Sequence, residues 1–124
     1  MENKAQQLSE RFLDHGVAIM RITTLLRRSV AGREIAGQLL RSGTSAGANH
    51  EEARGAQSRA DFLHKMQIVL KELRESLYWL RLIERSGTLK DEALTAAIGE
   101  TRQLSNIIGK SIVTAKGSGG TPSR

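Results

Sequence analysis

The side chain with the clearest chemical potential is Ser45, at the centre of Gly43-Thr-Ser-Ala-Gly47. This stretch matches G-x-S-x-G, a motif in which a strand-to-helix turn exposes a nucleophilic serine near a histidine base and an oxyanion hole. No strand can be placed before Ser45, and 124 residues are too few for the hydrolase fold that uses the motif. We therefore predict that Ser45 is not a nucleophile and that the chain has no catalytic residue.

Metal ligands are also poorly placed. The histidines His15, His50 and His64 do not form His-Glu-x-x-His, and Glu72-x-x-Glu75 lacks the histidine that di-iron bundles need. The chain has no cysteine, which excludes disulfides, thiolate metal sites and cysteine nucleophiles. We predict no metal, no cofactor and no enzymatic activity. On an apolar helix face, His15 is expected to be a hydrogen-bonded core or interface residue.

Several charged residues fall close to apolar helix faces, where an unpaired buried charge costs several kcal/mol. We predict a structural polar network made of Arg41, Asn49, Glu52, Glu72 and Glu75. Within it, Arg41 is expected to pair with Glu52 or with Glu75. The catalytic alternative is a glutamate acting as general base, but the sequence offers it no second chemical group.

The chain carries 19 Lys and Arg against 13 Asp and Glu, a formal net charge of +6. The candidate nucleic-acid-binding residues cluster at two predicted helix connections, Arg27, Arg28 and Arg33 at the first, and Arg54, Arg59 and Lys65 at the second. On antiparallel helices these connections lie at opposite ends, so only a ring of copies would multiply each cluster into a strong positive field. The same charges also suit a solvated surface that binds nothing, and the sequence leaves both readings open.

Aromatic residues are scarce, since the chain has only four of them. Three are expected in the core, so base stacking is a weak prospect. Any nucleic-acid binding should therefore be directed mainly at phosphates and should weaken as salt rises.

Helices must position these side chains, because no proline precedes Pro122 and apolar residues recur at intervals of three and four. We predict four helices, at about residues 5–29, 32–54, 58–85 and 90–115, with Ser58 capping the third. The second contains two glycines in Ser42-Gly-Thr-Ser-Ala-Gly-Ala-Asn49, each costing about 1 kcal/mol in a helix. Helical spacing on both sides still favours a helix there, with a face of small residues against which a neighbour can pack.

These segments predict an all-α fold, an up-down-up-down four-helix bundle, in a single domain of residues 1–115. The Gly- and Ser-rich tail, residues 116–124, is predicted to be disordered. The first and third helices have apolar faces wider than one internal seam needs, which indicates contact with other subunits. No segment has the roughly 18 to 20 apolar residues of a membrane helix, and the N-terminus is too polar for a signal peptide, so we expect a cytoplasmic protein without a membrane partner.

The sequence Gly37-Gln-Leu-Leu-Arg-Ser-Gly-Thr-Ser-Ala-Gly-Ala-Asn-His-Glu-Glu-Ala53, followed by Asp61-Phe62 and Lys71-Glu-Leu-Arg-Glu-Ser-Leu-Tyr-Trp-Leu80, resembles the four helix bundle protein family. Its members are associated with intervening sequences in bacterial large-subunit ribosomal RNA genes. The resemblance is specific across residues 37–83. It implies that the glycine-containing stretch is helical and that the chain forms a homopentameric barrel. The positions that carry over are Arg41, Ser42, Asn49, Glu52, Asp61, Phe62, Glu72, Glu75 and Trp79.

The resemblance also implies a distant similarity to the basic pentameric accessory protein of diversity-generating retroelements, which engages nucleic acid and a reverse transcriptase. Together with the charge, it predicts a non-enzymatic accessory protein that associates with nucleic acid, RNA in particular, as a basic homo-oligomeric ring, a homopentamer. The expected partners are further copies of the chain, RNA or DNA, and a polymerase or other protein. The alternative is a protein-interaction scaffold that binds no nucleic acid.

Overall fold

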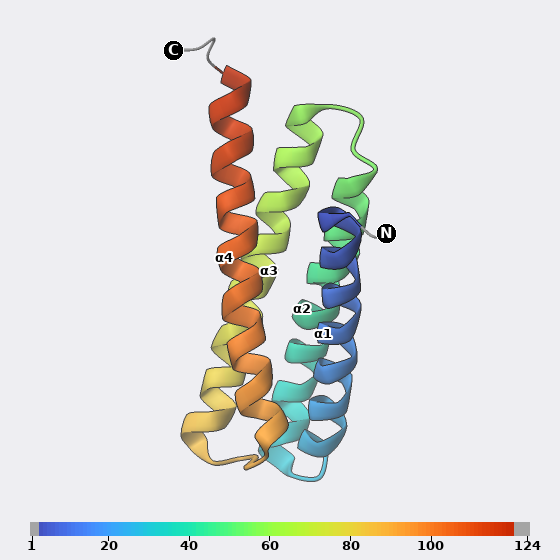
Figure 1. Ribbon diagram of the computed structural model, residues 1–124. Coiled ribbons are helices and arrows are strands. Elements are labelled where there is room, and N and C mark those ends of the chain that lie inside the picture. Colours follow the sequence, from blue (N-terminus) through green and yellow to red (C-terminus); the bar gives the residue numbers. More distant parts are fainter. Residues whose placement is uncertain (1–2, 121–124) are drawn as a thin grey trace.

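The computed structural model describes residues 3–120, which form four α-helices and no strand. The helices are α1 (Lys4–Leu26), α2 (Val30–Arg54), α3 (Arg59–Ser86) and α4 (Glu92–Gly120). They run alternately up and down, so that the α1–α2 and α3–α4 connections share one end (Figure 1). The predicted all-α four-helix bundle is confirmed.

Side-chain caps explain where three of the helices begin. The side chains of Asn3, Ser29 and Ser58 accept hydrogen bonds from the backbone amides three residues on, at 2.7, 3.0 and 3.0 Å. Because Ser29 caps α2, α1 ends at Leu26 rather than at the predicted residue 29. Gly87 follows α3 with a positive φ of 71°, which ends the helix in the left-handed conformation that glycine adopts most readily.

The glycine-containing stretch of α2 is helical, as expected, and its glycines allow α1 to approach closely. A Cβ atom added to Gly43 would lie 2.7 Å from Ile19 Cγ2, and one added to Gly47 would lie 3.3 Å from Phe12 Cβ. Ile19 and Phe12 are both buried. The packing that these glycines permit offsets their poor helix propensity.

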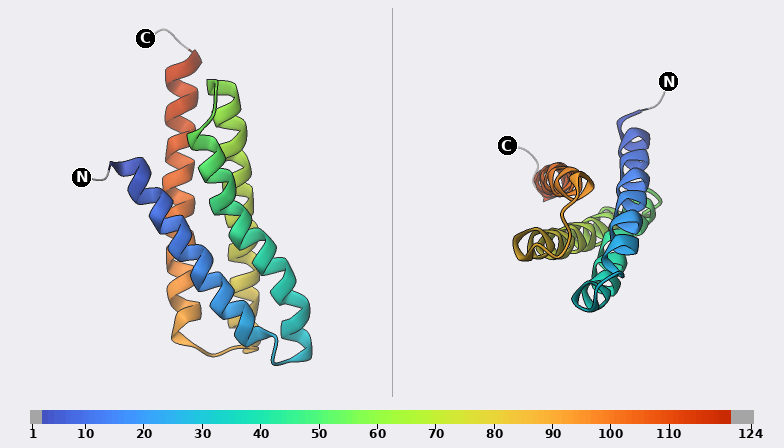
Figure 2. Two further views of the ribbon diagram at one scale, coloured as in Figure 1. Left: turned by 90° about the vertical axis from the view of Figure 1, so that its right-hand side faces the viewer. Right: turned by 90° about the horizontal axis from the view of Figure 1, so that it is seen from below.

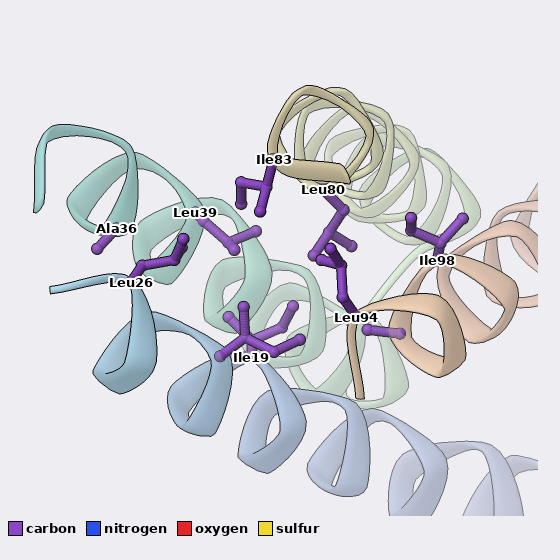
Figure 3. Close-up of a cluster of buried hydrophobic side chains, with 10 residues drawn as sticks. Ile19, Leu26, Ala36, Leu39, Leu80, Ile83, Leu94 and Ile98 are labelled. Carbon is purple, nitrogen blue, oxygen red and sulfur yellow. The ribbon is translucent and has the colours of Figure 1, made fainter. Parts of the chain in front are cut away.

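Two clusters of buried apolar side chains lie along the bundle. In the first, near the α1–α2 and α3–α4 connections, side chains such as Ile19, Leu39, Leu80 and Ile98 converge from all four helices (Figure 3). The second includes Phe12, Met66, Leu73, Leu104 and Ile108 and lies nearer the α2–α3 connection. Each fully buried aliphatic side chain contributes about 1.5–3 kcal/mol, so together the clusters hold each helix at one rotation and decide which side chains face outward.

The helices are not all parallel to one another. Helix α1 packs along α2 and lies at an angle to α4, so that its N-terminal part diverges from α4 (Figure 2). Part of the predicted wide apolar face of α1 lies on the outside of the bundle, where Leu13 and Met20 are 63% and 55% exposed.

The last helix is longer than predicted. It continues from the expected end at Ala115 to Gly120, into the segment predicted to be disordered. Extending an existing helix adds one hydrogen bond per residue without a new nucleation cost, which the composition of the tail does not reveal. Residues 121–124 of the predicted tail lie outside the described residues. Over the described part of the chain, no helix is both long and apolar enough to cross a membrane.

Candidate nucleic-acid interface

The first predicted basic cluster lies at the tight turn between α1 and α2. Arg27 and Arg28 form the turn, Arg33 follows on α2, and all three side chains are exposed. Backbone amides of Arg27 and Arg28 donate to the carbonyl oxygens of Thr23 and Leu25, each at 3.2 Å, and hold the turn. None of the ion pairs in residues 3–120 involves these arginines. Their charges are therefore available to an anion.

The second predicted cluster is partly occupied by contacts within the chain. Arg54 Nη1 donates to Ser9 Oγ at 2.9 Å, and Lys65 Nζ donates to Glu52 Oε1 at 2.6 Å. The hydrogen bond with Glu52 raises the pKa of Lys65. Of the three candidate residues here, Arg59 alone has no ion pair or side-chain hydrogen bond to another described residue. This cluster lies at the opposite end of the bundle from the first, so the fold does not bring the two together (Figure 1).

Part of the predicted polar network forms between α2 and α3. Arg41 lies 3.2 Å from Glu72 Oε1 through Nη1 and 2.5 Å from Glu75 Oε1 through Nη2. Trp79 Nε1 donates to the other oxygen of Glu75 at 3.1 Å. The hydrogen bonds from Arg41 and Trp79 lower the pKa of Glu75. Arg41 thus pairs with one of its two expected partners and also with Glu72.

The other two predicted members lie elsewhere. Glu52 is 11 residues after Arg41, about 16 Å along α2, which is beyond side-chain reach, and it pairs with Lys65 instead. Asn49 Nδ2 donates to the backbone oxygen and the hydroxyl of Ser45, at 2.9 and 3.0 Å. Of the two partners expected for Arg41, the structure therefore selects Glu75, and it places Glu52 and Asn49 outside the network between α2 and α3.

An open groove between α3 and α4 brings together cations that the sequence did not single out. It encloses about 1050 Å³, and its lining includes Arg74 from α3 and Arg102 and Lys110 from α4. All three side chains are exposed, and none belongs to an ion pair of the described chain. The eight-residue interval from Arg102 to Lys110 is a sequence signal for one helix face, but only the packing of α3 against α4 adds Arg74.

A second open groove, of about 630 Å³, lies between α1 and α2. Its lining includes Leu13, Val17 and Met20 of α1 and the small residues Gly47 and Ala48 of α2. Exposed apolar side chains grouped in this way are typical of surfaces that another protein covers.

A model of the 23S rRNA-intervening sequence protein family matches residues 3–110. The chain belongs to this family. A solved structure from Bacteroides thetaiotaomicron, described as a protein with unknown function from the S23 ribosomal protein family, is 34% identical and superimposes with a TM-score of 0.79. That comparison covers 85% of this chain and 97% of the other. None of the curated proteins compared matches the sequence. The family match confirms the resemblance drawn from residues 37–83.

Proposed function

We propose that this family member is a non-enzymatic, cytoplasmic accessory protein that binds RNA. The observation that carries the proposal is the α1–α2 turn, where Arg27, Arg28 and Arg33 are exposed and unpaired with any acid of the described chain. The net charge of +6 adds a long-range attraction for phosphates. The family's name refers to 23S rRNA, which favours RNA over other polyanions.

We further propose that the protein acts as a homo-oligomeric ring, a homopentamer. The support is the apolar groove of α1 and α2, where Leu13, Val17 and Met20 face solvent in a single copy. Burial of these side chains against a second copy would remove apolar surface from water. A ring would also repeat the arginine turn around one axis and concentrate its positive field.

Binding of a fluorescein-labelled RNA hairpin with a single-stranded loop tests the RNA proposal. We expect affinity to fall steeply as salt rises from about 50 to 200 mM, because each phosphate contact releases counterions. Changing Arg27, Arg28 and Arg33 together to Gln should flatten the slope of log affinity against log salt by about 2 if the loop nucleotides bind there. A variant with Lys4, Arg21 and Lys116 changed to Gln removes the same charge from scattered exposed positions and should keep the slope.

No binding by the unmodified protein, or an affinity that does not change with salt, would overturn the RNA proposal and favour the scaffold. Absolute mass by light scattering tests the ring separately. A pentamer of 13.6 kDa chains would weigh about 68 kDa. A monomeric mass would overturn the ring and leave RNA binding to be judged by the salt series.

A further inference from the structure

The outward face of α3 carries a line of cations with one aromatic residue among them. Arg74, Tyr78, Arg81 and Arg85 follow one another at intervals of four, three and four, which places them on one face of the helix over about 16 Å. All four side chains are exposed. None of the three arginines forms an ion pair within the described residues.

The groove between α3 and α4 widens this line into a two-walled basic surface. Arg74 lies on the α3 wall, and Arg102 and Lys110 lie on the α4 wall. Leu70 and Leu77 contribute apolar surface to the lining. We call the surface formed by Arg74, Arg81, Arg85, Arg102, Lys110 and Tyr78 the α3–α4 face.

Tyr78 is an exposed aromatic ring whose orientation is supported from behind. It is 59% exposed and contacts Trp79 edge to face, with ring centroids 5.1 Å apart and planes at 72°. Trp79 is in turn bonded to Glu75, and Glu75 to Arg41. The polar network between α2 and α3 therefore holds Trp79 in place, and Trp79 restrains Tyr78.

Beside the ring is a small hollow that suits a planar group. It encloses about 160 Å³ and is lined by Tyr78, Arg81, Leu82 and Arg85. A base that entered it would have an aromatic ring to stack on and two guanidinium groups within the same lining to meet its phosphates.

We infer that the α3–α4 face binds the backbone of single-stranded RNA and that one unpaired base stacks on Tyr78. The inference rests on the proposed function and assigns it a second site, away from the α1–α2 turn. A basic groove with an adjacent exposed aromatic ring is the arrangement that recognises single strands, whose bases are free to stack on protein. A duplex keeps its bases paired and offers Tyr78 nothing to stack on.

The test uses a fluorescein-labelled oligouridylate of about 20 nucleotides, which is longer than the roughly 4–16 nucleotides that a single-strand-binding groove covers. Changing Arg74, Arg102 and Lys110 together to Gln should flatten the salt slope by about 2, since each phosphate contact to a single strand contributes about 0.7. The charge-matched variant of Lys4, Arg21 and Lys116 should leave it unchanged.

Tyr78 is tested by substitution at constant charge. Tyr78→Ala should weaken binding about tenfold or more without changing the salt slope, because stacking does not release counterions. Tyr78→Phe keeps the ring and should retain the affinity. A blunt duplex of the same length should bind equally to the unmodified protein and to Tyr78→Ala.

The possible failures are distinct. If the unmodified protein binds neither the hairpin nor the oligouridylate, the proposed function fails and this inference fails with it. If it binds both but the α3–α4 variants behave like the unmodified protein, only this inference is overturned. A lower mass for Tyr78→Ala by light scattering would assign the face to contact between copies, and binding of polyglutamate as tightly as RNA would assign it to acidic proteins. Either result overturns the inference.

Discussion

Two buried histidines have nitrogen atoms without a partner. Thr101 donates its hydroxyl hydrogen to Ala97 O at 2.7 Å, so its Oγ1 accepts from His15 Nε2 at 2.8 Å, and Nδ1 of His15 is the unprotonated nitrogen. The His50 ring stacks on Phe12 with centroids 4.7 Å apart. Within the described chain, Nδ1 of each histidine is buried without a hydrogen bond. Protonation of either nitrogen would place an unpaired charge in the core.

We predict that the protein loses stability as pH falls below 6.5. Burial lowers the pKa of His15 against an opposing effect of Glu100, and lowers that of His50, where Glu51 opposes it and Arg54 reinforces it. The unfolded chain then binds protons that the folded chain does not, so the free energy of unfolding should fall by up to about 1.4 kcal/mol per pH unit for each histidine. Urea unfolding at pH values from about 7.5 to 5 measures it.

The matched variants are His50→Gln and His64→Gln. His50 is buried and His64 is exposed. His50→Gln should reduce the dependence of stability on pH, whereas His64→Gln should preserve it. A free energy of unfolding that does not change from about pH 7.5 to 5 would contradict the inference that burial lowers the pKa of His15 and His50.

The pairing of Arg41 with two glutamates predicts a loss of stability when the arginine is removed. Arg41→Met would leave the buried carboxylate of Glu72 without a cation, which should cost about 1–2 kcal/mol because the Arg41 side chain is 51% exposed. The free energy of unfolding in urea measures this cost. Glu72→Gln in the Arg41→Met background should recover part of it.

The contact between Arg41 and Glu75 also makes the free energy of unfolding depend on pH. The hydrogen bond from Arg41 is the main reason that the pKa of Glu75 lies below its usual 4.5. The contact therefore stabilises the folded protein fully above pH 4.5, and this stabilisation is lost as pH falls through the folded-state pKa. The difference in free energy of unfolding between Arg41→Met and the unmodified protein should therefore become smaller at acidic pH. A difference that does not change with pH would show that Arg41 acts through packing alone.

At the scale of the elements, α2 exchanges helix propensity for close contact with α1. We predict that Gly43→Ala destabilises the protein by about 1–3 kcal/mol, although alanine is the better helix former, because its Cβ would lie 2.7 Å from Ile19 Cγ2. Gly37 is the matched control, since it lies in the same helix with no atom within 4 Å of an added Cβ. Gly37→Ala should stabilise by about 0.5–1 kcal/mol.

Thermal or urea unfolding of Gly43→Ala and Gly37→Ala measures the two changes in stability. Opposite signs at Gly43 and Gly37 would show that α1–α2 contact, and not propensity, placed glycine in α2. Stabilisation by Gly43→Ala would mean that α1 can move away at little cost.

At the scale of the whole molecule, the outer side of α1 and α2 carries an apolar groove that no other described segment covers. We predict that Leu13→Glu together with Met20→Glu lowers the mass measured by light scattering to that of a monomer, because the charges would be buried against a second copy. Val30→Glu is the control, since Val30 is similarly exposed and lies outside the groove. An unchanged mass for the double variant would contradict the proposal that this groove is a contact between copies.

The four helices and the cap of the third were predictable because they depend on residues close together in the chain, whereas the cap at Ser29 had been placed inside the first predicted helix. Ser58 and Asp61 indicate the start of α3, and apolar spacing indicates which faces turn inward. The helical state of the Ser42–Asn49 stretch was also predicted, although its propensity is poor. The family resemblance, carried by residues 37–83, was confirmed by the match over residues 3–110.

Contacts between helices were decided by the tertiary structure. The interval of 11 residues along α2 already places Glu52 beyond the reach of Arg41, but only the packing of α2 against α3 brought Glu72 and Glu75 to its guanidinium group. Sequence spacing also did not indicate that Arg74 and Arg102, 28 residues apart, line one groove. Nor did it show that Tyr78 contacts Trp79 while its ring remains exposed. Side chains three or four residues apart on a helix meet whatever the fold, whereas those on different helices meet only after core packing has set the rotation and offset of each helix.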